Sequence, residues 1–237
     1  MVGNLQGAII AAGRGERLRS STGGVPKPLV TLGTKTLIAR QAEILREAGA
    51  SEVLAVVNSE TARLIKERRV ELPEHLKLVV RDTANSMESL FVLGERLAPG
   101  YFVLATVDAV MPAGEVRRFV SQARAMTSER GMDGALGVVR WRGDERPLFA
   151  EVSTDRTITR LGGGQCPTVT AGIYYLPQRI FDFVADARAG GLGAMRQFLA
   201  MLLDKGLLLG AIELSEAIDV DEASDLEAAR ATMGDKA

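Results

Sequence analysis

The 237-residue chain has few of the side chains on which several common enzyme chemistries depend. It contains one cysteine, one histidine and one tryptophan, and aromatic residues make up only 5%. The single cysteine, Cys166, excludes an intrachain disulfide and favours a reducing compartment, so we expect a cytoplasmic protein. With His75 as its only histidine, the chain offers no ready Ser-His-Asp or Cys-His arrangement. Catalysis by a serine or cysteine nucleophile is therefore not expected.

The chain also lacks an excess of charge of either sign and any long apolar run. Its formal net charge is −1, so no overall field attracts nucleic acid or an anionic membrane. No apolar stretch reaches the roughly 18 residues of a membrane span, and residues 1–12 lack the features of a signal peptide. We expect no nucleic-acid partner and no membrane span, so any anion site must be local. Oligomeric state is not indicated by the sequence.

Segments typical of strands and helices alternate along the chain. Strands are predicted at 7–12, 52–57, 76–80, 101–106, 134–139, 148–152, 157–161, 170–176 and 207–214, and helices at 36–48, 60–68, 86–97, 114–130, 177–186, 194–205 and 223–232. This order predicts a single α/β domain with a mostly parallel central sheet flanked by helices. A hairpin around the turn 153–156 adds antiparallel character.

The stretch AAGRGERLRSSTGGVPKPL, residues 11–29, follows the first predicted strand. In open parallel sheets ligands bind at the carboxyl ends of strands, and glycines let backbone N–H groups approach phosphate oxygens. The alternative is a flexible surface loop with solvated arginines. The dinucleotide pattern G-x-G-x-x-G fails because position 18 is Leu18, and the G-x-x-x-x-G-K-[ST] loop is absent. The expected nucleotide-binding residues here are Ala11, Ala12, Gly13, Arg14 and Gly15.

Positive charge is concentrated in the same stretch. Arg17 and Lys27 are expected to supply charge to phosphates, together with Arg14 and Arg19. Prolines on both sides of Lys27 restrict its backbone. The stretch therefore predicts a charged phosphate-binding loop.

The strand, then G-x-G-x-R-L at residues 13–18 and P-K-P-L at residues 26–29, resembles a two-part signature. It is that of the nucleotidyltransferases which attach a nucleoside monophosphate to a phosphorylated small molecule. The resemblance implies a Rossmann-like fold of the GT-A-like kind. It also implies a nucleotide-binding half at 1–112 and an acceptor-binding half at 113–237, and it makes Arg17 and Lys27 catalytic.

The resemblance further implies an aspartate at the end of a central strand and another before the last helix. Asp108 in YFVLATVDAV fits the first place, and Asp219, with Asp221 two residues on, fits the second. Asp225 is expected to be a surface or first-turn residue, and a strand-end cap is the alternative for Asp108. Carboxylates brought together from distant positions suit a hard cation, so Asp108, Asp219 and Asp221 are the expected Mg²⁺ ligands and Asp108 is also counted as catalytic.

The segment around Asn85 and Ser86 bears on the choice of nucleotide. It resembles the branch of the family that uses CTP with phosphocholine or inositol phosphate, so these two residues are expected to contact the base. The alternative is that they only cap the helix that follows. The resemblance places acceptor contacts at Glu151, Thr170 and Gly172 in the second half.

The expected reaction is transfer of a nucleoside monophosphate from an NTP, with CTP favoured, to a phosphorylated small molecule with release of pyrophosphate. Two alternatives stay open. A glycosyltransferase that consumes a nucleotide-sugar has a related architecture, but it usually carries D-x-D where this chain has Asp108-Ala109-Val110. A non-catalytic nucleotide-binding regulator would bind an NTP without turning it over.

Overall fold

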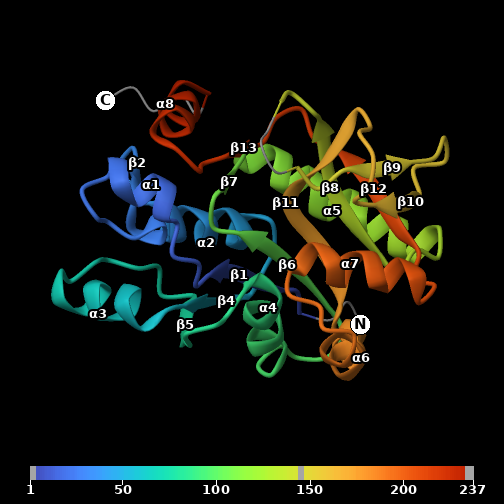
Figure 1. The fold of residues 1–237 in the computed structure, drawn as a ribbon, viewed down its shortest axis with the longest axis horizontal. Coiled ribbons are helices and arrows are strands. Elements are labelled where there is room, and N and C mark those ends of the chain that lie inside the picture. Colours follow the sequence, from blue (N-terminus) through green and yellow to red (C-terminus); the bar gives the residue numbers. More distant parts are fainter. Residues whose placement is uncertain (1–3, 144–146, 233–237) are drawn as a thin grey trace.

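A seven-stranded mixed sheet forms the centre of the molecule in the computed structural model, which describes residues 4–143 and 147–232 (Figure 1). The strand order is β12-β8-β11-β6-β1-β4-β5. These strands are β1 (Gln6–Ala11), β4 (Glu52–Val57), β5 (Leu76–Val80), β6 (Tyr101–Thr106), β8 (Gly134–Arg140), β11 (Thr168–Pro177) and β12 (Leu209–Glu213).

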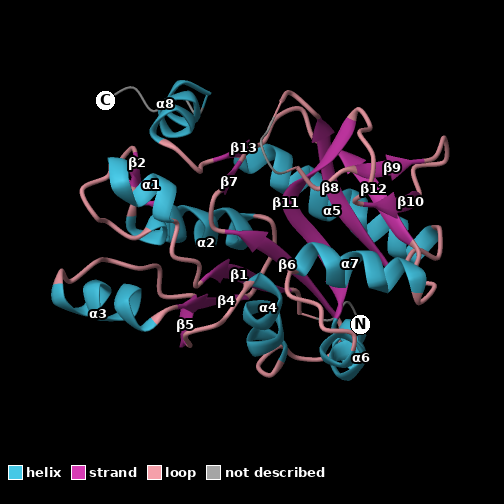
Figure 2. Ribbon diagram, in the orientation of Figure 1, coloured by secondary structure: helices cyan, strands magenta, loops and turns pink. Residues whose placement is uncertain are grey.

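Helices cover both faces of the sheet (Figure 2). They are α1 (Glu16–Ser21), α2 (Leu37–Glu47), α3 (Ser59–Glu67), α4 (Ser86–Gly94), α5 (Ala113–Glu129), α6 (Val184–Ala189), α7 (Met195–Asp204) and α8 (Ala223–Thr232), with short 3-10 helices η1 (Lys27–Leu29) and η2 (Gln178–Phe183). The predicted α/β class and mixed sheet are confirmed. None of the helices in the described part of the chain is long and apolar enough to cross a bilayer.

The antiparallel member of the sheet is β11, which lies between β6 and β8 and pairs antiparallel with both. The predicted hairpin does form from β9 (Ala150–Val152) and β10 (Ile158–Leu161), but it makes a separate two-stranded sheet. The expectation that the hairpin gives the central sheet its antiparallel character was therefore wrong. An isolated strand such as β11 carries no local sign of its direction.

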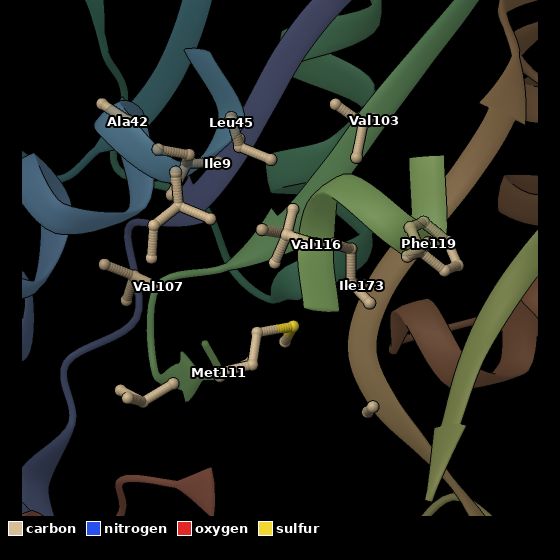
Figure 3. Packing of buried hydrophobic residues seen from close by; sticks show 14 of the residues in the cluster. Ile9, Ala42, Leu45, Val103, Val107, Met111, Val116, Phe119 and Ile173 are labelled. Carbon is tan, nitrogen blue, oxygen red and sulfur yellow. The ribbon is translucent and has the colours of Figure 1, made fainter. Parts of the chain in front are cut away.

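Two hydrophobic clusters lie on opposite faces of the sheet, because alternate strand residues point to alternate faces. Along β1, Ile9 belongs to one cluster, with α2 and α5, and Ile10 to the other, with α4 and α7. Figure 3 shows the first cluster, where Leu45 of α2 and Phe119 of α5 pack near Ile9 and Ile173. Burial on both faces holds β1 and β6 rigidly at the centre.

Two very short ladders shape the edge of the sheet where these central strands end. β7 (Ala109–Val110) pairs antiparallel with β13 (Ile218–Asp219), and β2 (Thr31–Leu32) pairs with β3 (Lys35–Thr36). The β7–β13 pair joins the segment after β6 to the segment before α8. Chain positions more than a hundred residues apart therefore meet there.

Candidate active site

The candidate site lies at the carboxyl ends of β1 and β6. These strands run parallel and in register up to the pair Ile10 and Thr106, so the segments that follow them start side by side. The segment after β1 was predicted as one open loop. It contains the helix α1 and the 3-10 helix η1, which begins at Lys27.

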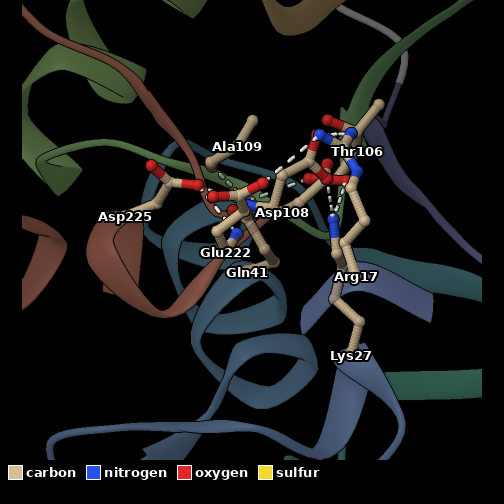
Figure 4. Close-up of polar contacts among 9 residues, drawn as sticks. Arg17, Lys27, Gln41, Thr106, Asp108, Ala109, Glu222 and Asp225 are labelled. Carbon is tan, nitrogen blue, oxygen red and sulfur yellow. Dashed lines mark hydrogen bonds and ion pairs between the residues drawn. The ribbon is translucent and has the colours of Figure 1, made fainter. Parts of the chain in front are cut away.

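Lys27 lies buried between two carboxylates, with a residue exposure of 6%. Its Nζ donates hydrogen bonds to Oδ2 of Asp108 at 2.9 Å and to Oδ1 of Asp221 at 2.6 Å (Figure 4). Burial acts to lower the pKa of the ammonium, but the charges and hydrogen bonds of Asp108 and Asp221 outweigh it and raise the pKa. Lys27 is therefore protonated at neutral pH.

Arg17 of α1 adds a second cation to the same cluster. Its guanidinium donates to Oδ2 of Asp221 at 2.7 Å, and a second nitrogen lies 3.9 Å from Glu222. Asp221 thus contacts both predicted catalytic cations, one through each carboxylate oxygen. The structure brings together Arg17, Lys27 and Asp108, as the sequence predicted.

Asp219 completes a group of three carboxylates. It lies opposite Ala109 in the β7–β13 ladder, and the N–H of Val220 donates to the carbonyl of Asp108 at 3.0 Å. One oxygen from each of Asp108, Asp219 and Asp221 lies within 4.8 Å of the other two. Hard carboxylate oxygens this close are the donor set that Mg²⁺ prefers, so these residues fit the predicted metal.

Gly15 and Gly13 have different roles in the loop. Gly15 adopts a left-handed backbone with φ of 57° at the start of α1, and an added Cβ would lie 2.8 Å from Cβ of Lys27. A side chain at Gly13 would meet no atom of the described residues within 4 Å. Gly15 is thus needed for packing against Lys27, whereas a close approach of ligand to Gly13 stays a prediction.

The remaining residues of this stretch differ in burial: Ala11 and Ala12 are buried and Arg14 is exposed. The carbonyl of Ala12 accepts a hydrogen bond from Asn58 at 3.1 Å, and the side chain of Arg14 is 83% exposed. Arg19, expected to serve phosphates, pairs instead with Glu60 of α3 at 2.6 Å and lowers the pKa of that carboxyl. The role of Ala11, Ala12 and Arg14 in binding nucleotide stays a prediction.

Asn85 and Ser86 stand at the start of α4. Oδ1 of Asn85 accepts from the N–H of Glu88 at 3.0 Å, so the predicted helix cap is confirmed. The hydroxyl of Ser86 accepts from the N–H of Met195 at 3.2 Å, which ties α4 to α7. Contact of either residue with a base stays a prediction.

A cavity of about 500 Å³ opens beside the carboxylates. Its walls include Arg17, Ser86, Asp108, Thr170 and Gly172. Tyr174 also lines it, and burial raises the pKa of this phenol to about 12, so the wall there is neutral. Two of the three predicted acceptor contacts therefore line a cavity next to the predicted metal ligands.

Gly172 lies in the bulge of β11 against β8, beside the end of β6. Its φ is 71°, and an added Cβ would lie 2.6 Å from Cβ of Ala109 and 2.7 Å from Oγ1 of Thr106. Glu151, the third predicted acceptor residue, lies on the β9–β10 hairpin and pairs with Arg160. It does not line the cavity, and its predicted role is untested.

A second cavity of about 650 Å³ adjoins the first and shares part of its wall. Arg142, Ile218 and Asp219 belong to the walls of both. The second cavity is lined further by arginines and carboxylates from α5, β8, the β9–β10 turn, and the end of β12 with the segment after it, among them Arg118, Arg140, Arg156, Glu213 and Glu216. These residues were not predicted, because scattered charged residues carry no motif.

Residues 7–170 match the family described as the MobA-like NTP transferase domain. Among curated relatives, the choline-phosphate cytidylyltransferase of Streptococcus pneumoniae is 35% identical over 42% of this chain and 43% of its own length. The bifunctional protein GlmU of Leifsonia xyli is 45% identical over 94% of the chain and 48% of its own length. The bifunctional IPC transferase and DIPP synthase of Rubrobacter xylanophilus is 28% identical over 92% and 50%. The chain thus spans half or less of the length of these relatives.

Solved structures share the fold at low sequence identity. The inositol-1-phosphate CTP transferase of T. maritima superposes with a TM-score of 0.78 at 20% identity, covering 99% of this chain and 97% of that one. A putative glucose-1-phosphate thymidylyltransferase of Bacillus anthracis superposes with a TM-score of 0.80 at 18% identity, covering 98% and 96%. Identities this low show the fold alone.

Proposed function

The chain belongs to the family of MobA-like NTP transferase domains, and we propose that it transfers a nucleoside monophosphate from an NTP to a phosphorylated small molecule, releasing pyrophosphate. One observation carries the proposal. The buried ammonium of Lys27 lies between Asp108 and Asp221, with Arg17 and Asp219 in the same cluster. Such a set of cations and carboxylates at the ends of β1 and β6 suits a triphosphate and its counter-ion.

The chemistry needs positioning more than proton transfer. A phosphomonoester acceptor is largely ionised at neutral pH, so its oxygen needs no strong base. That oxygen attacks the α-phosphorus, the new P–O bond forms, and the bond to the bridging oxygen breaks so that pyrophosphate leaves with the electron pair. Lys27 and Arg17 stabilise the charge on the phosphates during this exchange.

Asp108, Asp219 and Asp221 would hold Mg²⁺, which when bound supplies charge that stabilises the reacting phosphate oxygens. The same carboxylates also fix Lys27 and, through Asp221, Arg17. The nucleotide side would thus come from residues 1–112, with Asp219 and Asp221 added from the second half. The single cysteine supports a cytoplasmic location.

CTP is the favoured donor in this proposal. The choice is supported by the segment of Asn85 and Ser86, which resembles the cytidylyltransferase branch, and by the match to the choline-phosphate cytidylyltransferase. Ser86 lines the cavity beside Asp108, so α4 begins close to the reacting groups. The other NTPs are the competitors to test.

The acceptor would occupy the cavity lined by Thr170 and Gly172. The phosphate of the acceptor must lie close to Asp108, and the rest of the molecule can then extend past Arg142 toward the second cavity. That route is lined by charged side chains and has little aromatic surface. It fits a polar, hydroxyl-rich acceptor better than an apolar one.

A matrix of nucleotides and acceptors tests the proposal. CTP, dTTP, GTP, UTP and ATP are each combined with phosphocholine, inositol phosphates and hexose 1-phosphates, and pyrophosphate is measured with and without Mg²⁺. We expect release only with an NTP, a phosphorylated acceptor and the metal together. Sugar transfer from a nucleotide-sugar without pyrophosphate would favour a glycosyltransferase, and tight NTP binding without turnover would favour a regulator.

A further inference from the structure

Gln41 is a buried polar residue on the core face of α2. Its exposure is 4%, and it lies in the same helical stripe as Leu37, Ile38 and Leu45, all of which are buried. A buried amide is costly unless hydrogen bonds replace its contacts with water. A glutamine in this buried position is therefore expected to have hydrogen-bond partners within the protein.

The partners are the two carbonyls that flank Asp108 (Figure 4). Nε2 of Gln41 donates to the carbonyl oxygen of Thr106 at 3.1 Å and to that of Ala109 at 2.5 Å. One side chain thus holds both ends of the turn from Thr106 to Ala109. Because both of the amide's N–H groups can be used, the turn is fixed in direction as well as in place.

Two backbone hydrogen bonds and the contact of Lys27 with the Asp108 carboxylate also hold this turn. The N–H of Val107 donates to the carbonyl of Ile10 at 3.1 Å, and the carbonyl of Asp108 accepts from Val220 at 3.0 Å. Gln41 is therefore the side chain that completes the set from the side of α2. Since Ala109 also pairs with Asp219 in the β7–β13 ladder, the same amide acts on both carboxylate-bearing segments.

We propose that Gln41 is a positioning residue that sets the separation of Asp108 and Asp219 for cation binding. A role of Gln41 in catalysis rests on the proposed function, but its effect on the positions of Asp108 and Asp219 does not depend on which reaction the protein performs. Without the amide, two largely buried carbonyls lose their donor and the turn relaxes. The carboxylates would then spend less time in the arrangement that a cation requires, as when an outer partner of a metal ligand is removed.

The test compares Gln41→Met with Gln6→Met. Gln6 is a suitable control because its Oε1 also holds a backbone segment, accepting from the N–H of Ala98 at 2.6 Å, at the opposite end of β1. Binding of Mn²⁺ in the presence of CTP is measured by calorimetry, and hydrogen exchange is followed in peptides covering 106–110 and 218–221. We expect Gln41→Met to weaken Mn²⁺ binding roughly 10- to 100-fold and to speed exchange in both peptides, with Gln6→Met within twofold of wild type.

Mn²⁺ affinity within twofold of wild type in Gln41→Met would overturn the proposal, as would an equal loss in Gln6→Met. If Gln41→Met does not fold, Gln41→Asn replaces it, because the shorter amide can reach at most one of the two carbonyls. It should give a smaller loss in the same direction, and no loss would equally overturn the proposal. Hydrogen exchange without metal or nucleotide tests the positioning role of Gln41 separately from the proposed nucleotidyl transfer. Faster exchange in Gln41→Met would support the positioning role even if the protein transferred no nucleotide.

Discussion

The ammonium of Lys27 lies 2.9 Å from a carboxylate oxygen of Asp108, although 81 positions separate the two residues in the chain. Three carboxylates within 4.8 Å of one another would repel strongly in a partly buried place. Lys27 and Arg17 offset this repulsion, so the acidic cluster can exist before any ligand arrives. The same cations are then close at hand for phosphate oxygens.

Replacing Lys27 by methionine tests its charge. The substitution keeps an unbranched side chain, and we expect kcat/KM for nucleotidyl transfer to fall about 100- to 1,000-fold because phosphate charge is no longer stabilised. Lys35→Met is the matched control, since Lys35 is exposed and pairs only with the nearby Glu43 among the described residues. Steady-state pyrophosphate release measures both, and equal activities of the two variants would contradict the assigned role.

Asp108→Asn and Asp219→Asn test the carboxylate cluster. Each removes a negative charge from a possible metal ligand while keeping its size, so both should weaken Mn²⁺ binding at least tenfold and lower kcat. Asp204→Asn, at the end of α7, is the control and should change neither. Wild-type Mn²⁺ affinity in both cluster variants would rule out a metal site there.

Gly15→Ala tests the close packing of the loop on Lys27. The left-handed backbone costs about 1–2 kcal/mol for alanine, and contact with Cβ of Lys27 adds about 1–3 kcal/mol. Gly23→Ala bears the same backbone cost at φ of 65° but meets no described atom within 4 Å. Urea unfolding should show a larger loss of stability for Gly15→Ala than for Gly23→Ala. Measurements of kcat/KM should show that Gly15→Ala loses activity and Gly23→Ala retains it. Loss of equal size at both positions would mean that only backbone strain matters.

Asn85→Asp separates the two interpretations of this residue. Aspartate caps a helix as well as asparagine does, so the free energy of unfolding should not fall, but the variant has no side-chain N–H to offer a base. We expect KM for CTP to rise about tenfold, as for one lost hydrogen bond of about 1.4 kcal/mol. Asn85→Ala should in addition lose about 1 kcal/mol of stability. An unchanged KM in Asn85→Asp would leave the residue a helix cap only.

Gly172→Ala tests the contact between the acceptor cavity and the Asp108 turn. The added methyl would press on Ala109 and Thr106, so we expect a higher KM for the acceptor and a lower kcat. Gly162→Ala also has a left-handed φ, of 78°, but its Cβ meets no described atom within 4 Å. Kinetics varying the acceptor at saturating NTP distinguish the two, and similar values would contradict a role for the bulge.

Local sequence patterns were sufficient for most of the elements. Periodic apolar residues gave β4, β5, β6 and α8 with the bounds found in the structure, and Asn85 marked the start of α4. The helix α1 was missed, because it has only six residues and follows Gly15, whose left-handed backbone gives no side-chain cap to recognise. A helix this short has little propensity of its own.

The same local patterns could not predict pairing between strands that are distant in the sequence. β7 and β13 have two residues each and exist only because they meet, so neither leaves a periodic signal. Asp108 and Asp219 were nonetheless found, through a family signature rather than through geometry. Gln41 could have been noticed as a polar residue within an apolar helical stripe, but its partners on the Asp108 turn could not.

The β7–β13 ladder can form only late in the synthesis of this part of the chain, because β13 follows all seven strands of the central sheet. A nascent chain that has emerged only as far as β12 already contains β1, β6, Lys27 and Asp108, but it lacks Asp219 and Asp221. Until that segment has been made, Lys27 can pair with Asp108 but not with Asp221. The seven strands of the sheet are therefore all present before the segment that completes the acidic cluster.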